Sequence, residues 1–142
     1  TLKQMILKYS PEETLLKGSN WLKKDSDPEL IDAQSFAVDG SVFVSKENGL
    51  ILEYAQGQKT KEIRLQISPA LNGGAKLFTN EKMKNLYALD PKSRRIVSMN
   101  KKDNFTIQYV SENFDSLKGF WITDDEKTIF FLNGSKIFRI EI

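Results

Sequence analysis

The chain has 142 residues, of which 39% are hydrophobic and 28% charged, and this is enough for one domain with a buried core. Its 21 basic and 19 acidic residues are mostly interspersed and leave a net charge of +2, which argues against a dedicated nucleic-acid-binding protein. Cysteine and histidine are both absent, which excludes disulfides, thiolate metal sites and catalysis by Ser-His-Asp or Cys-His arrangements.

A tetrapeptide near the start of the chain introduces a tandem repeat. Ile6–Tyr9 reads Ile-Leu-Lys-Tyr and returns 45 residues later as Ile-Leu-Glu-Tyr at Ile51–Tyr54. The same register continues at Arg95–Val97 and at Lys136–Phe138. Looking for such self-similarity comes first, because a period of 20–50 residues is typical of repeat architectures.

Two sets of aromatic residues support the repeat. The first set lies in the segments that precede the later copies, at intervals of 44 and 43 residues: Phe43, Tyr87 and Phe130. The second set has two intervals of 42: Phe36, Phe78 and Phe120. Three markers in the same order predict a unit of about 41–45 residues with four short strands, the pattern of a β-propeller blade.

The expected strands follow the chain in groups of up to four. They are residues 4–9 and 14–22; then 33–38, 41–44, 51–54 and 62–67; then 75–79, 85–88, 95–97 and 105–110; and finally 117–123, 128–131 and 136–138. Strict alternation supports residues 62–67, where Ile63 and Leu65 share one face and Arg64 takes the other. Asn48-Gly49 and Asn133-Gly134 suit tight hairpins, since both residue types tolerate positive φ. Residues 68–74, with one proline and two glycines, predict the link between units.

We therefore predict an all-β fold, a β-propeller segment of four-stranded antiparallel blades. It contains about three blades of a propeller of six to eight, with six preferred. Residues 1–142 are a partial propeller: 1–30 hold the third and fourth strands of one blade, 31–72 and 73–115 are complete blades, and 116–142 hold the first three strands of another. Both ends contribute a third strand, so they do not complete one blade together. We expect the remaining blades from the rest of a longer chain or from a second copy.

One unit resembles a known family of blades. Asn85–Asp90, Arg95–Val97 and the turn at Asp103 are similar to NHL-type, six-bladed propeller repeats, in which a strand ends in Asp and the next begins with Arg-Ile. The preceding unit departs from this pattern, with Ser45–Glu47 at the Asp position and Leu50-Ile51 at the Arg-Ile position.

The segment Trp21–Leu30, followed by Ala37–Val42, also resembles propellers at the C-terminal ends of uncharacterised bacterial proteins. That resemblance implies a propeller appended to a membrane-anchored chain, and it favours an extracytoplasmic or membrane-anchored location. No run in the sequence approaches the roughly 20 apolar residues of a membrane-spanning helix. Any membrane contact is therefore expected through segments outside these residues.

Two groups of carboxylates are candidate metal ligands. Asp25, Asp27 and Glu29 lack the glycine and the distal bidentate Glu of a calcium loop, so we interpret them as a solvated connection. Asp124–Glu126 is expected to be a hairpin turn. The fold resembles that of six-bladed lactonase-like enzymes, whose channel binds a divalent ion through carboxylates and amides. The first strand of each blade would line that channel, and the predicted first strands here offer no carboxylate. This chain is therefore expected to hold no metal or cofactor.

Four residues are candidates for ligand binding: Gln34, Lys76, Lys118 and Trp21. The first three lie two residues before Phe36, Phe78 and Phe120, so the period of two places each on the same side as its phenylalanine, toward one mouth of the channel. Two interpretations are open. In the first, the two ammonium groups attract an anionic ligand; in the second, all three residues are ordinary polar residues of the channel mouth.

The two tryptophans allow two interpretations. Each is a carbohydrate or peptide platform, or packs between blades as we expect of Phe43, Tyr87 and Phe130. Packing in the core is preferred for Trp121, and Trp21 stays open between the two.

The preferred function is a non-catalytic module that presents loops for protein interaction or assembly within a larger protein. One alternative is binding of an anionic ligand or glycan at the channel mouth. The other is a metal-dependent propeller hydrolase of the lactonase type. A protein partner is expected, and nucleic acid is not.

Overall fold

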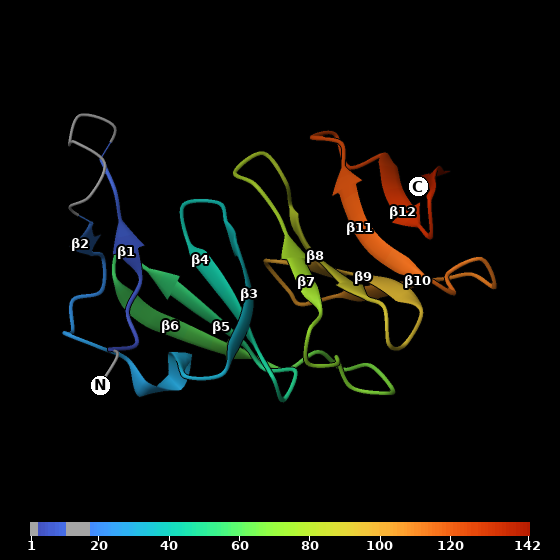
Figure 1. Ribbon diagram of the computed structural model, residues 1–142. Helices are drawn as coiled ribbons and strands as arrows, with labels where there is room; N and C mark the ends of the chain where they lie inside the picture. Colours follow the sequence, from blue (N-terminus) through green and yellow to red (C-terminus); the bar gives the residue numbers. More distant parts are fainter. Residues whose placement is uncertain (1–2, 11–17) are drawn as a thin grey trace.

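The computed structural model describes residues 3–10 and 18–142, and in these residues the regular secondary structure consists almost entirely of antiparallel strands (Figure 1). Three sheets, which we call blades 1, 2 and 3, follow one another along the chain, and within each blade neighbouring strands are consecutive in sequence. Blade 1 contains β3 (Ala33–Val38), β4 (Val42–Lys46), β5 (Ile51–Ala55) and β6 (Gln58–Ile63); blade 2 contains β7 (Lys76–Phe78), β8 (Asn85–Asp90), β9 (Arg95–Asn100) and β10 (Thr106–Val110); blade 3 contains β11 (Leu117–Ile122), β12 (Thr128–Asn133) and β13 (Lys136–Glu141).

The N-terminal segment forms a small sheet of its own beside blade 1. β1 (Leu7–Lys8) pairs with β2 (Ser19–Asn20), and the amide of Trp21 donates to the carbonyl of Ile6 at 2.8 Å. A single 3₁₀ turn, η1 (Pro28–Leu30), then leads into β3. The prediction of a strand over residues 14–22 falls partly on residues 11–17, which lie outside the described residues. Its described part is β2.

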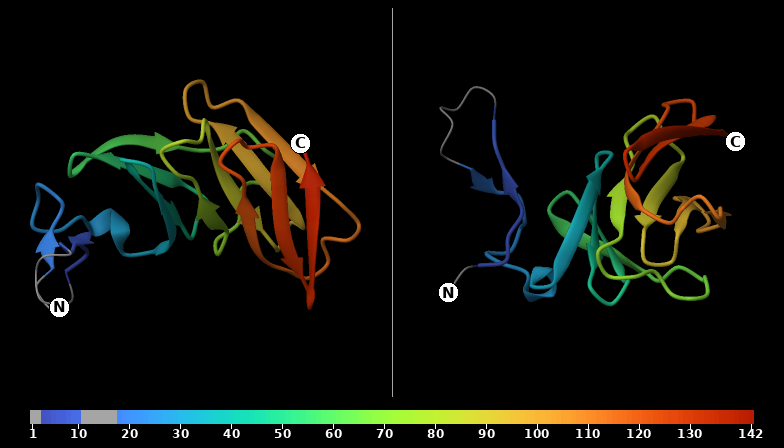
Figure 2. Two further views of the ribbon diagram at one scale, coloured as in Figure 1. Left: turned by 90° about the horizontal axis from the view of Figure 1, so that it is seen from above. Right: turned by 45° about the vertical axis from the view of Figure 1, so that its right-hand side comes forward.

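The blades stand side by side with their faces opposed (Figure 2). Backbones of successive blades approach each other near their inner strands: β3 contacts β7, the first strand of blade 2, and β11 contacts β8, its second strand. This arrangement confirms the predicted all-β architecture of four-stranded antiparallel blades. In the part of the chain that the structure describes, no helix has the length and apolar character to cross a membrane.

Apolar residues from facing blades make two cores. Between blades 1 and 2, Phe43 and Ile51 pack with Leu77 and Leu86, all of them less than 8% exposed. The core between blades 2 and 3 includes Tyr87, Leu89, Ile96, Phe114, Ile122, Ile129 and Phe131. Each such side chain contributes about 1.5–3 kcal/mol when it is fully buried, so contact between neighbouring blades is the main stabilising term.

The fourth strand of blade 1 begins earlier than the predicted residues 62–67. β6 spans Gln58–Ile63, because Gln56 and Gly57 adopt φ values of 51° and 77° and reverse the chain directly after β5. Positive φ at both central residues is typical of a tight hairpin turn. Ile63 and Leu65 are both buried, as their alternation predicts, but Leu65 packs beyond the end of the strand.

A glycine lets the link between blades 1 and 2 lie close to a hairpin of blade 1. Gly49 has a φ of 79°, and a Cβ atom placed on it would lie 2.1 Å from the carbonyl oxygen of Leu71. Asn48-Gly49 is therefore the predicted hairpin turn, and it is also the surface against which the link packs.

A buried arginine joins that link to blade 2. The Arg95 guanidinium bonds Asp90 at 2.9 Å, and the two side chains are 2% and 0% exposed. The same guanidinium donates to the carbonyl oxygens of Pro69 and Ala70 at 2.7 and 3.1 Å and to Gln108 at 2.7 Å. Asp90 and Arg95 are the residues on which the resemblance to NHL-type blades rests. Here they fix the turn between β8 and β9 to the incoming link, and each of the three guanidinium nitrogens of Arg95 donates a hydrogen bond.

Replacing Arg95 with Gln should lower the free energy of unfolding by about 3 kcal/mol, because Asp90 would stay buried without its cation. Urea denaturation followed by circular dichroism measures the change. Arg94→Gln is the matched control, since Arg94 is exposed and its substitution should change stability by less than about 0.5 kcal/mol. Equal losses in the two variants would contradict the role assigned to Arg95.

Candidate functional site

Each blade has a forward face, which we define as the face toward the next blade along the chain. Strand pairing places the same two positions of the first and second strands on this face in all three blades. The pairs are Ala37 with Phe43, Phe78 with Tyr87, and Trp121 with Phe130. In blades 1 and 2 the second member is buried against the following blade, with Phe43 3% and Tyr87 1% exposed.

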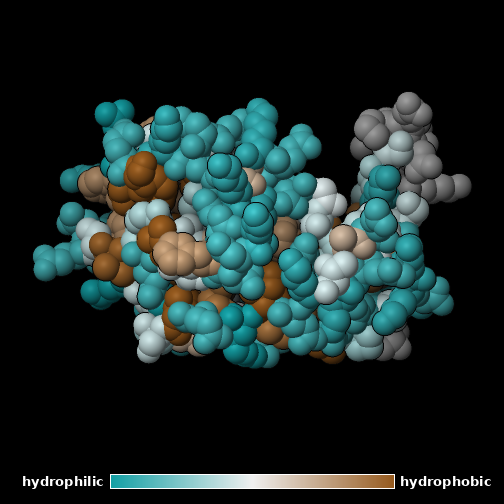
Figure 3. Space-filling view, turned by 180° about the vertical axis from the view of Figure 1, so that it is seen from behind, coloured by the Kyte–Doolittle hydropathy of each residue, from teal (hydrophilic) through white to brown (hydrophobic). Residues whose placement is uncertain are grey.

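The forward face of blade 3 is open. Trp121, Phe130 and Ile137 are 57%, 36% and 75% exposed, and Leu132, which pairs with Ile137, is half-buried. We call these four residues the blade 3 patch. Seen from behind, apolar side chains gather at the end of the molecule that carries the last blades, away from the N-terminal segment (Figure 3).

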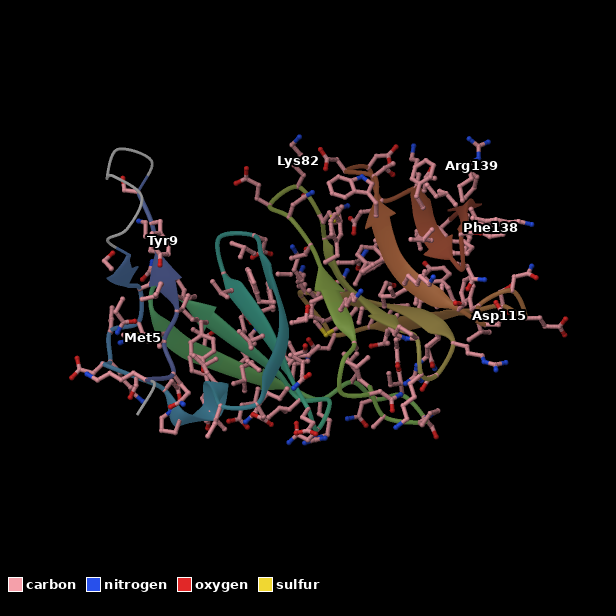
Figure 4. All side chains as sticks on the ribbon, in the orientation of Figure 1. Met5, Tyr9, Lys82, Asp115, Phe138 and Arg139 are labelled. Carbon is pink, nitrogen blue, oxygen red and sulfur yellow. The ribbon has the colours of Figure 1, made fainter. Side chains whose placement is uncertain are left out.

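Two sequence predictions at this patch concern burial: Phe130 was expected between blades and Trp121 in the core. Among the described residues Phe130 stays 36% exposed and Trp121 57% exposed, and Trp121 touches blade 2 through Phe78, at 4.9 Å between ring centroids. That a further blade covers both stays a prediction. Both residues hold the strand positions that the repeat predicts. Their exposure therefore reflects the absence of a following blade among the described residues, and not a shift in strand register. On the last strand, labelled in Figure 4, Arg139 pairs with Phe130 and shares this open face, whereas Phe138 pairs with Phe131 and stacks on it at 5.3 Å between ring centroids on the opposite face.

The first strands do not bring the three phenylalanines of the sequence marker to one face. Phe36 pairs with Val44 and Phe120 with Phe131, whereas the corresponding position of blade 2 is Leu77, which pairs with Ala88. Leu77 belongs to the core between blades 1 and 2, and Phe78 packs against the core between blades 2 and 3. A shift of one residue reverses the face, so the interval of 42 placed Phe78 on the wrong side.

This shift divides the predicted ligand-binding group. Lys76 and Lys118 do come together, because the Lys76 ammonium donates to the carbonyl oxygen of Lys118 at 2.7 Å. Gln34 shares the face of Phe36, and its amide donates at 3.4 Å to the Asp32 carbonyl. All three side chains are exposed. Whether any of them binds a ligand stays a prediction.

Trp21 lies at a groove on the opposite end of the blade stack. The groove has a volume of about 690 Å³ and lies between residues 3–8 and the strands β3 and β4. Trp21 and Gln34 both line it, together with Phe36, Val38 and Val42. Trp21 is half-buried and packs against the core of Leu22, Val44, Leu52 and Tyr54, so it serves partly as core and partly as groove wall.

The acidic segment at residues 25–29 is not wholly solvated, which corrects the sequence interpretation. Asp27 is only 8% exposed; it accepts from the Tyr54 hydroxyl at 2.9 Å and from the Glu29 amide at 3.1 Å. Tyr54 lies 27 residues away, so no local pattern could have revealed this contact. Among residues 3–10 and 18–142, no group of three or more acidic side chains is placed to hold a metal ion.

The turn at Asp124–Glu126 is the predicted hairpin turn between β11 and β12, and it also binds blade 2. The Glu126 carboxylate accepts from the backbone amides of Lys84 and Asn85 at 2.8 and 3.0 Å and from the Tyr87 hydroxyl at 3.1 Å. Asp124 accepts from Lys82 at 2.7 Å, and this ion pair lowers the pKa of Asp124 and raises that of Lys82. Figure 4 shows Lys82 at the tip of the turn that faces blade 3. The sequence analysis did not predict this contact of Glu126 with blade 2, which we call the Glu126 clasp. Its only sign in the sequence is a group of acidic residues in a turn.

No model of a known protein family matches the chain, and neither does any curated protein. Solved structures do. Hsv2 from Kluyveromyces lactis superimposes with a TM-score of 0.57 at 8% identity, over 78% of this chain and 33% of that one. Virginiamycin B lyase from Staphylococcus aureus superimposes with a TM-score of 0.55 at 16% identity, over 78% of this chain and 41% of that one.

The fold is that of a β-propeller segment. Propellers are the fold of both neighbours, and this chain spans between a third and about two-fifths of their lengths. Identities this low show the fold alone. One neighbour is named as a lyase, so the propeller fold does not decide between catalysis and binding. The narrower resemblance to NHL-type blades stays a prediction.

Alkaline pH should destabilise the propeller segment through Tyr54. Burial, then the hydrogen bond from its hydroxyl to Asp27, raises the pKa of Tyr54 far above its ordinary value near 10. The unfolded chain releases this proton near pH 10 while the folded chain retains it, so the free energy of unfolding should fall as the pH rises above about 10. A series of urea denaturations between about pH 9 and pH 11.5 measures the fall, which Tyr54→Phe should reduce. The same slope in both proteins would contradict the assignment.

Proposed function

We propose that this chain is a non-catalytic propeller segment that acts as an assembly scaffold within a larger protein. Its open blade 3 patch packs against a further propeller blade. The observation that carries the proposal is the exposure of Trp121, Phe130 and Ile137 on one face of blade 3. Exposed apolar residues gathered on one side of a protein typically mark an interaction site.

The register of the repeat supports a blade as the occupant. The forward positions that hold Trp121 and Phe130 in blade 3 hold Phe78 and Tyr87 in blade 2, where they face a following sheet. The surface complementary to such a face is the rear of a blade, with apolar residues at the positions of Leu77 and Leu86. The blade comes from the remainder of a longer chain or from a second copy, and in either case it is a protein surface.

The last strand supports the same proposal. In the described residues β13 pairs only with β12, so the backbone groups on its other edge are open to a fourth strand. An open strand edge beside exposed apolar residues readily pairs with another polypeptide. A fourth strand added there would complete blade 3 to the four strands of blades 1 and 2.

Replacing Ile137 with Asp should weaken association of the purified chain with itself about tenfold or more, because a charge would enter the contact. The side chain is 75% exposed, so the fold of the monomer should be retained. Sedimentation velocity over a range of concentrations measures the association. Phe105→Asp is the matched control, since Phe105 is 66% exposed and lies outside the blade 3 patch. Equal association in both variants would overturn the proposal, whereas a wild-type chain that stays monomeric would exclude a second copy as the source of the blade.

A second candidate function, binding of an anionic glycan at the first strands, is favoured by one observation. The structure joins Lys76 and Lys118 on the adjoining strands β7 and β11, where Phe78 contacts the exposed Trp121 edge-on at 4.9 Å between ring centroids. Two exposed lysines on the strands that carry Phe78 and the exposed indole of Trp121 suit a sugar ring that carries carboxylates.

Calorimetric titration with oligogalacturonate tests this candidate. The wild-type chain should bind more weakly as salt increases, and Lys76→Ala with Lys118→Ala should lower the affinity at least about fivefold. Lys102→Ala with Lys136→Ala is the control, because these lysines are exposed elsewhere on the surface. No binding by the wild type, or equal losses in the two double variants, would remove this candidate.

A further inference from the structure

The groove beside blade 1 is apolar on both sides. One wall is the N-terminal segment, with Ile6 and Leu7, and the other is the rear face of blade 1, with Phe36, Val38 and Val42. Phe36 and Val38 are 69% and 49% exposed, so these two side chains of the rear face lie open to the groove. Met5, which Figure 4 shows in the N-terminal segment, also lines it.

The repeat identifies β1 as the third strand of a blade. Ile6–Tyr9 matches Ile51–Tyr54, which contains most of β5. β5 pairs on one edge with β6 and on the other with β4, and β4 in turn pairs with β3. In the described residues β1 pairs only with β2, which corresponds to β6. The first and second strands of this blade would therefore lie between β1 and the inner edge of the blade. The groove lies at those two strand positions.

The contacts between blades 1 and 2 show what such positions place against a rear face. There the second strand of blade 1 supplies Phe43 and its first strand supplies Ala37, and these meet Leu77, Leu86 and Ala88 of blade 2. The forward residue of the second strand is aromatic in every described blade: Phe43, Tyr87 and Phe130. The rear face of blade 1 offers Phe36, Val38 and Val42 at the groove, as the rear face of blade 2 offers its apolar residues.

We propose that the groove accepts an antiparallel pair of strands, the first two strands of a propeller blade. The pair extends the sheet at the free edge of β1 and places an aromatic side chain of its second strand on Val42 and Phe36. Main-chain hydrogen bonds to β1 supply the alignment, and apolar burial against β3 and β4 supplies the affinity. This goes beyond the proposed function, which concerns the opposite end of the blade stack.

The chain itself provides a hairpin with which to test the proposal. Residues 75–92 contain β7, β8 and the turn after them, and a copy placed directly ahead of Lys3 puts Ile6 where Ile96 follows that hairpin in blade 2. Hydrogen–deuterium exchange should then show at least about tenfold slower exchange of the amides in β1, and the midpoint of thermal unfolding should rise by several degrees. Unchanged exchange in β1 would overturn the proposal.

Two matched variants separate a specific fit from a general effect of the added segment. In the first variant, Lys replaces Phe78 and Tyr87 in the added copy only. This change should abolish the protection of the β1 amides. Val38→Asp in the groove should abolish it as well, and Val38 is exposed enough for the chain to fold. Protection that survives either change would contradict the proposed contact.

The unfused chain supplies the last comparison. If its β1 amides become protected as concentration rises, a second copy occupies the groove and the hairpin is not its occupant. Because Ile137→Asp alters the other end of the blade stack, the sedimentation experiment on that variant gives its answer independently. A negative result in the hydrogen–deuterium exchange experiment therefore does not affect the proposal for the blade 3 patch. A negative result in the sedimentation experiment likewise does not affect the proposal for the groove.

Discussion

The packing of one blade against the next is the constraint on which this structure depends. Each sheet has two apolar faces, and only a neighbouring sheet covers them: Phe43 and Tyr87 become buried because a further blade follows. Alternation along the strands makes this strict, since a displacement of one residue would move an entire apolar set to the other face. The same rule leaves Trp121 and Phe36 exposed at the two ends of the described blades.

Polar contacts set the spacing between blades that apolar packing alone does not fix. Arg95 bonds a carboxylate of its own blade and two carbonyl oxygens of the link, so the link enters blade 2 at one position. Glu126 binds two amides and a hydroxyl of the preceding blade from within a turn. The first contact therefore ties the link to blade 2, and the second ties blade 3 to blade 2.

Much of the fold follows from the sequence because its repeat is visible in the aromatic residues of the second strands. Phe43, Tyr87 and Phe130 hold equivalent positions, as their intervals predict. The first strands are less regular, because Leu77 and not Phe78 is the counterpart of Phe36, and an interval cannot reveal a shift of one residue. The burial of Asp27 and the clasp of Glu126 depend on residues far away in sequence, so only the three-dimensional structure shows them.

The two open faces of this chain are different surfaces, one led by Trp121 and the other by Phe36. A contact between them is heterologous, because each copy would give one surface and receive the other. Such head-to-tail contacts end only when the rotation from copy to copy closes a circle, and otherwise they continue as a helical filament. The angle between successive blades therefore decides whether units of this kind build a ring of defined size or a fibre.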